Sequence, residues 1–148
     1  MALSLTFEKP RAYASGIQSN FSHYAVKANT TIWAGQVLST DVANHAGLVL
    51  PHDAAGTFTT PRFVGFAEES VVNVTGKRVR ATTKGRIILA AITNMTGATN
   101  IGATVHASND DTFTDTSTAT TVPIGKVADY VAGEGFHVQF EGFAIQSV

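Results

Sequence analysis

The chain has 148 residues, a net charge of −1 and a charged fraction of only 14%, well below that of a typical globular domain. Such a balance creates no general attraction for nucleic acid or an acidic membrane surface, and we expect neither as a partner. The absence of cysteine excludes disulfide bonds, thiolate metal sites and cysteine nucleophiles. Abundant Thr and Val with scattered Gly favour an all-β protein.

Residues 1–26 form a leader with large apolar side chains among polar ones. Its first apolar residues alternate and predict a short strand; the prominent ones are Leu3, Leu5, Phe7, Tyr13, Phe21 and Tyr24. The leader either packs on its own domain or lies as an extended arm across a neighbouring subunit. Ordering about 25 residues costs on the order of 25–50 kcal/mol, so an ordered leader requires backbone hydrogen bonds besides apolar burial.

The leader lacks the basic segment and apolar core of a signal peptide. No apolar run in the chain approaches the 20 or so residues of a membrane span. We therefore expect synthesis in a cytoplasm and no membrane association.

Residues 27–148 are predicted to form one antiparallel β domain, a compact barrel or sandwich with at most one short helix. Turn signals rich in Gly, Asn and Asp recur every eight to twelve residues. They separate expected strands at 31–38, 47–50, 63–74, 77–83, 86–93, 103–107, 122–131 and 135–146. Residues 40–46 are the one place where a helical turn is expected.

An apolar-Gly-apolar-Ala phrase occurs twice, around Gly65 and around Gly125. The echo extends to Gly35 and Gly102, and more loosely to the segments 83–88 and 140–145. Either a duplicated β unit or chance in a Gly-rich chain explains it. In both cases a glycine within a strand permits a bulge or a close backbone approach, which lets a small sheet curl.

The order of these glycine phrases resembles the capsid cement, or head decoration, proteins of tailed bacteriophages. The phrases are Trp33-Ala34-Gly35-Gln36-Val37-Leu38, Phe63-Val64-Gly65-Phe66-Ala67, Val79-Arg80-Ala81-Thr82-Thr83-Lys84-Gly85, Ile101-Gly102-Ala103-Thr104-Val105, Asp110-Asp111-Thr112-Phe113-Thr114 and Pro123-Ile124-Gly125-Lys126-Val127. The similarity covers roughly residues 30–146 and leaves the leader outside.

This resemblance implies a non-enzymatic virion protein with a β-tulip-like body, to which the leader of this chain would be added as an extended N-terminal arm. It would bind the outside of the assembled head at junctions between major capsid proteins and stabilise the shell. The implied partners are the major capsid protein and further copies of the chain, as a homotrimer in preference to a dimer. A symmetric oligomer that touches several capsid subunits gains avidity, because later contacts become intramolecular.

No pattern of catalytic or cofactor-binding residues stands out, so we expect neither enzymatic activity nor a cofactor. The five histidines are scattered without metal-ligand spacing and are expected at the surface or partly packed. Asp110, Asp111 and Asp115 are expected in a solvated hairpin turn, with a calcium site as the alternative.

The most informative charged segment runs from Lys77 to Arg86. Arg78 and Arg80 are expected on one strand face and Val79 and Ala81 on the other. A hairpin predicted at 83–85 would return Arg86 to that basic face. The face is either simply solvated or an ion-pairing surface for an acidic partner; a nucleic-acid surface is the remaining alternative, disfavoured because no interleaved aromatic residues supply a stacking platform. Together with the leader apolar residues, this basic face gives the candidate interface: Leu3, Leu5, Phe7, Tyr13, Phe21, Tyr24, Arg78, Arg80 and Arg86.

A glycan-binding β module of a phage fibre or surface lectin is the alternative function. Trp33, Tyr13, Tyr24 and Tyr130 are the aromatic residues available to stack on sugars, although a single Trp in an Ile-Trp-Ala segment is more often part of a core.

Overall fold

The computed structural model describes residues 3–14, 20–44, 47–53, 58–72 and 76–143. The fold is all-β, as predicted, with a single antiparallel sheet that is not closed into a barrel and is compact and sandwich-like. The strands are β1 (Asn20–Ala25), β2 (Val37–Asp41), β3 (Leu50–Pro51), β4 (Pro61–Ala67), β5 (Arg78–Leu89), β6 (Thr104–Ala107), β7 (Phe113–Thr114), β8 (Val122–Val131) and β9 (Gly135–Glu141).

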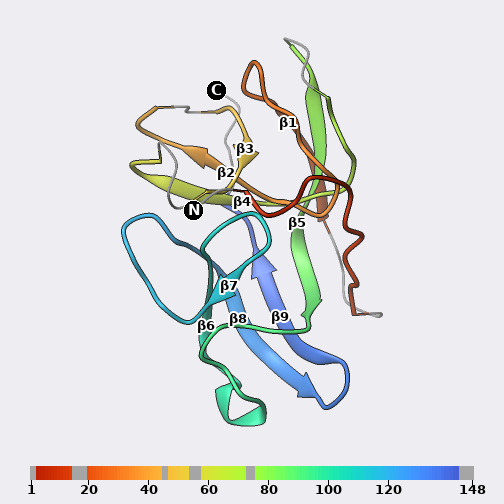
Figure 1. Ribbon diagram of the computed structural model, residues 1–148, viewed down its shortest axis with the longest axis vertical. Coiled ribbons are helices and arrows are strands. Elements are labelled where there is room, and N and C mark those ends of the chain that lie inside the picture. Colours follow the sequence, from red (N-terminus) through yellow and green to blue (C-terminus); the bar gives the residue numbers. More distant parts are fainter. Residues whose placement is uncertain (1–2, 15–19, 45–46, 54–57, 73–75, 144–148) are drawn as a thin grey trace.

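The two halves of the chain repeat one pattern of strand pairing. In the first half the hydrogen-bonded order is β1-β5-β4-β2-β3, and in the second it is β5-β9-β8-β6-β7. The N-terminal part of β5 pairs with β1 and β4 and belongs to the first half. Its C-terminal part pairs with β9 and belongs to the second half. Figure 1 shows β1–β4 together at one end of the molecule and β6–β9 at the other, with β5 extending between them.

Matching hydrogen bonds establish which residues correspond in the two halves. Gly35 donates its N–H to the Ala67 carbonyl at 2.8 Å, and Gly102 donates to the Val127 carbonyl at the same distance. The remaining correspondences follow from the strand registers. The chain is therefore built from two copies of one five-strand unit that share β5. Counterparts, first half before second, include Leu38 and Val105, Gly65 and Gly125, Val79 and Phe136, and Tyr24 and Leu89.

The repeated glycines have the role expected of them. In β4 the register with β2 skips Val64, beside Gly65, and in β8 the register with β6 skips Ile124, beside Gly125. A Cβ on Gly65 would lie 2.3 Å from the Thr82 carbonyl oxygen, and one on Gly125 would lie 1.8 Å from that of Gln139. Both positions therefore combine a bulge with a backbone approach too close for any side chain.

Each half encloses its own apolar cluster. The smaller cluster lies in the first half and contains Ile32, Leu38 and Val79. The larger one fills the second half around Phe136 and Phe140 and also takes in Phe66 of β4. Their rings meet edge to face, with the Phe66 and Phe140 centroids 5.0 Å apart. Aromatic packing therefore joins the two halves.

The hairpin predicted at 83–85 is wrong, because β5 continues unbroken through Lys84 and Gly85. Gly85 lies opposite Phe140 of β9, so the missing side chain accommodates a cross-strand aromatic residue instead of a turn. Arg86 therefore does not return to Arg80. Six residues of extended strand separate the two by roughly 20 Å.

Other local expectations also need correction. No strand forms over 3–7, whereas Asn20–Ala25 of the leader and Phe113–Thr114 form strands that were not predicted. The strand expected over 31–38 begins only at Val37, after an isolated bridge at Ile32. Residues 42–44 form a turn and not a helix; 45–46 lie outside the described residues, as do the predicted strand ends at 73–74 and 144–146. The 3₁₀ turn among the described residues is Ala98–Asn100.

Candidate functional site

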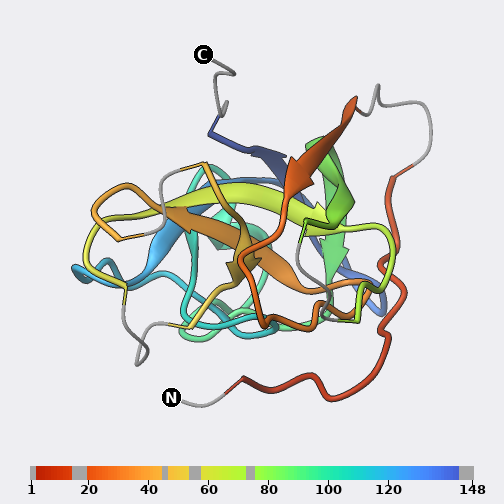
Figure 2. The ribbon, with the colours of Figure 1, turned by 90° about the horizontal axis from the view of Figure 1, so that it is seen from above.

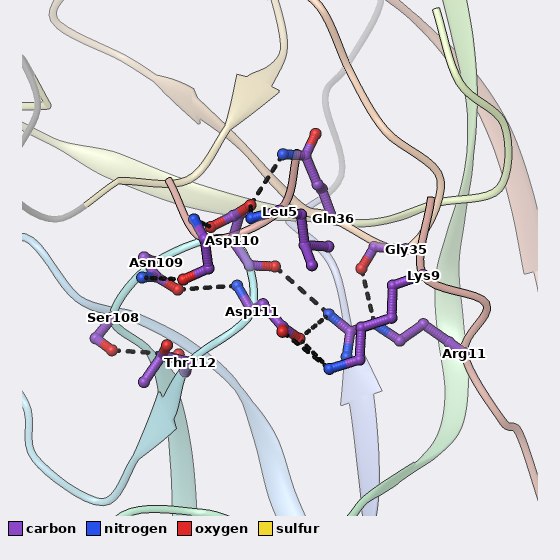
Figure 3. A network of polar contacts seen from close by, with 11 residues as sticks. Leu5, Lys9, Arg11, Gly35, Gln36, Ser108, Asn109, Asp110, Asp111 and Thr112 are labelled. Atoms are coloured by element: carbon purple, nitrogen blue, oxygen red, sulfur yellow. Dashed lines mark hydrogen bonds and ion pairs between the residues drawn. The ribbon is translucent and has the colours of Figure 1, made fainter. Parts of the chain in front are cut away.

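The leader is fixed to the body by two adjacent carboxylates, Asp110 and Asp111, which we call the leader anchor. Asp110 is fully buried. Its carboxylate accepts hydrogen bonds from the Ser4 N–H at 2.7 Å, the Leu5 N–H at 3.0 Å and the Gln36 side-chain amide at 2.9 Å. Figure 3 shows these groups converging on the loop that carries Asn109–Thr112. Buried carboxylates require such donors, because burial of an unpaired charge is very costly.

Two basic side chains of the leader complete the anchor. Lys9 Nζ and Arg11 Nη2 each lie 2.8 Å from a carboxylate oxygen of Asp111. Arg11 also donates from Nε to the Gly35 carbonyl at 2.7 Å, and its guanidinium lies 5.6 Å from the Phe66 ring centroid. Since only 6% of the Arg11 side chain is exposed, this ion pair is shielded from solvent and holds the leader more firmly than a surface pair would.

Backbone hydrogen bonds hold the next leader segment on the edge of β5. Ala14 donates its N–H to the Arg86 carbonyl and Ile88 donates to the Ala12 carbonyl, both at 2.9 Å. Tyr13 between them packs on the larger cluster, and its hydroxyl donates to Glu68 at 3.1 Å. Burial, followed by the Glu68 charge, raises the pKa of Tyr13. The ordered leader thus has the backbone bonds that its entropy cost demands. Figure 2 shows it running along the rim of the molecule.

The predicted interface residues of the leader do not gather in one patch. Leu3 and Phe7 are exposed at 41% and 68%, while Leu5 and Tyr13 are half-buried. Phe21 and Tyr24 lie in β1 rather than in a free arm; Phe21 is 47% exposed, and Tyr24 packs on the smaller cluster.

Arg78 and Arg80 are exposed, and the intervening Val79 is fully buried, as the alternation predicted. The Arg80 guanidinium lies 4.3 Å from the centroid of the Phe21 ring. Phe21 of β1 and Arg78 and Arg80 of β5 therefore form one basic surface with an aromatic component, which we call the β1–β5 surface. Arg86 is separate from it and donates to Gln139 at 3.3 Å.

Several titratable groups lie in places that the sequence did not reveal. Asp110 is buried instead of lying in a solvated turn, and His52 and His106 are buried as well. Burial lowers the pKa of both histidines, that of His52 to about 4. Asp41, despite the opposing effect of burial, has its pKa lowered to about 2 because the N–H groups of Thr59 and Thr60 and other donors bind its carboxylate.

The described part of the chain contains no cluster of three His, Cys, Asp or Glu side chains able to hold a metal ion. The three acids considered for calcium have other partners: Asp110 and Asp111 bind the leader, and Asp115 accepts a hydrogen bond from Asn94 at 2.9 Å. The only sequence signal for the anchor was the pairing of basic residues in the leader with Asp110-Asp111. That signal did not indicate that the leader and these two acids, about a hundred residues apart in the chain, bind each other.

Among the described residues, none lies in a helix long and apolar enough to cross a membrane.

No protein-family model matches the chain, and no curated protein matches it.

Proposed function

We propose that the protein is a capsid cement protein, which binds the outer surface of an assembled phage head at junctions between major capsid proteins and stabilises it. The observation that carries this proposal is the β1–β5 surface, where Phe21 and Arg80 stack in the open on a fixed two-stranded scaffold. An exposed aromatic residue beside arginines is the composition of a protein-binding surface. The order of glycine phrases along the body supports the same function.

The anchored leader also supports adhesion. Its main chain is held at Ser4 and Leu5 by Asp110 and at Lys9, whose N–H donates to the Ala34 carbonyl, yet Leu3 and Phe7 remain exposed. A partner that covers these two side chains therefore does not have to order a flexible arm first, which lowers the entropy cost of binding.

The test uses heads of the encoding phage from which the protein has been stripped. The purified chain should bind them at a copy number close to that of the major capsid protein. Arg78→Glu with Arg80→Glu should reduce occupancy at least about tenfold, if each charge contributes about 1 kcal/mol. Arg62→Glu with Lys126→Glu is the matched control, because both residues are exposed in other strands and the change in net charge is equal.

Equal occupancy of the two double variants would show that the β1–β5 surface does not bind the head. Failure of the parent chain to bind heads at all would reject the function itself. We further propose a homotrimer in preference to a dimer, which light scattering on the purified chain measures directly.

A glycan-binding module is the second candidate, and one observation favours it. Trp33 is half-buried rather than part of the core. It borders a hollow of about 440 Å³ that is also lined by Leu3, Leu50 and Phe58. A sugar that stacks on Trp33 would shift its fluorescence in a titration, and Trp33→Leu, which removes the chain's one Trp, should abolish sugar binding measured by calorimetry. Scarce copies in virions would likewise favour this function over cement.

A further inference from the structure

The internal repeat allows one edge of the molecule to be compared with another. In the second half, the outer edge of β5 is covered by the leader: the Arg86 carbonyl accepts from Ala14, and the Ile88 N–H donates to Ala12. Tyr13, between them, pairs antiparallel with Ile87. Its ring centroid lies 6.2 Å from that of Phe140. The leader thus adds a short strand and inserts one aromatic side chain.

The counterpart of this edge in the first half is the outer edge of β1. Ser22 pairs with Ala81, as Ile87 pairs with Val138, and Phe21 and His23 on either side correspond to Arg86 and Ile88. Figure 2 shows β1 at the periphery of the molecule, with β5 beside it.

The main-chain groups at this edge point outward. Val26 donates its N–H to the Lys77 carbonyl. Because bonding alternates along antiparallel strands, Ser22 and Tyr24 also face β5, while Phe21 and His23 face away from it. Within the described residues, no hydrogen bond involves the Phe21 carbonyl or the His23 N–H. Their two counterparts are the groups that bind the leader.

A hollow lies where the counterpart of the Tyr13 ring would be. It has a volume of about 260 Å³ and is lined by Ser22, Tyr24, Thr83 and Phe143, together with the charged Lys84 and Glu141. Ser22 corresponds to Ile87, and Thr83 corresponds to Phe140, which contacts Tyr13. The hollow is several times larger than the ~30 Å³ that one water molecule occupies in the liquid, so it has room for an aromatic ring.

We propose that the outer edge of β1 binds an extended segment of a partner protein. The segment adds antiparallel to β1, bonds to Phe21 and His23, and places one aromatic side chain in the hollow beside Ser22 and Thr83. Small residues flank the aromatic residue, as in Ala12-Tyr13-Ala14, and acidic residues follow, because Arg80 lies on the exposed side of the strand pair. This is strand addition at a sheet edge, and it does not depend on the partner being a capsid protein.

The probe is a synthetic peptide, Asp-Glu-Ala-Tyr-Ala-Glu-Asp, titrated into the full ¹⁵N-labelled chain and followed by NMR. We expect saturable shifts confined to β1, Thr83 and the residues around the hollow. Replacing the peptide's Tyr by Ala should weaken binding roughly tenfold or more, which is the effect of burying one aromatic side chain.

Two variants of the chain locate the site. His23→Pro removes an N–H that points away from β5 and should abolish binding, whereas His23→Ala keeps the N–H and should bind normally. Ser22→Phe fills the hollow from within and should also block the peptide, independently of the proline. Folding of each variant is checked by the unshifted resonances of β8 and β9.

Three results would overturn the proposal. One is the absence of saturable shifts up to about 10 mM peptide, and another is equal binding by the parent, His23→Pro and Ser22→Phe chains. The third is a dimer of the chain alone that His23→Pro converts to a monomer, because a second copy would then be the occupant of the edge.

Discussion

Replacing Asp110 by Ala tests whether the anchor holds the leader. The substitution removes a buried carboxylate that accepts from Ser4, Leu5 and Gln36. Hydrogen bonds to charged groups contribute about 1.5–3 kcal/mol each. The Ser4 and Leu5 N–H groups regain water if the leader detaches, but the fully buried Gln36 amide does not. We therefore expect a loss of about 3–5 kcal/mol in the free energy of unfolding, a large part of a typical domain's 5–15 kcal/mol.

Two measurements check this expectation. Urea unfolding gives the loss of stability. Trypsin gives the release of the leader, because the Arg11 side chain is only 6% exposed when paired and the bond after it should become cleavable. Asp115→Ala is the matched control, since that exposed carboxylate binds only Asn94 and Thr116 among the described residues. If Asp110→Ala is no less stable than the control and Arg11 stays protected, the leader is held by its backbone bonds alone.

Two other predictions concern burial and close packing. The pKa of His52 is lowered from 6.5 to about 4 in the folded protein. As the pH falls, His52 is therefore protonated in the unfolded chain before it is protonated in the folded one, and the stability present above pH 7 is lost toward pH 4. The difference is roughly 3 kcal/mol; His52→Gln should remove it from denaturation curves between pH 7 and 4.5, and an unchanged curve would contradict the assignment. Gly125→Ala forces a Cβ to within 1.8 Å of the Gln139 carbonyl oxygen and should lower the melting temperature by several degrees or prevent folding. Gly97→Ala, which meets only ordinary contacts with Tyr130, should not, and equal melting temperatures would refute the close approach.

Local sequence patterns predicted the strands whose surroundings are regular. β8 (Val122–Val131) has the predicted bounds, because its run of largely apolar residues continues through the bulge at Gly125 and Gly133 supplies the following turn. The same kind of signal failed at Gly85, since a glycine marks a turn and a close cross-strand approach equally well. Only the partner strand, with Phe140 opposite, distinguishes the two.

The leader could not be derived from local patterns for a different reason. The alternation of Leu3, Leu5 and Phe7 predicts a strand, but the main-chain groups of Ser4 and Leu5 bind a carboxylate 105 or more residues away. Side-chain capture of backbone groups competes with sheet pairing, and its partner is fixed only by the tertiary fold. The candidate interface is dispersed for a different reason, since Phe21 and Tyr24 lie in β1, which pairs with β5.

The repeat also explains why the two halves are not interchangeable. The first half presents Val37, Phe63 and Phe66 to the second, and all three belong to the larger cluster. Their counterparts in the second half are Thr104, Pro123 and Lys126, which are exposed and border a hollow of about 560 Å³. Another unit of the same kind would have to bury the Lys126 charge there, which is costly without a paired carboxylate. The lysine on this outer face therefore opposes head-to-tail stacking of a further unit, as the polar faces of capping repeats do in longer arrays.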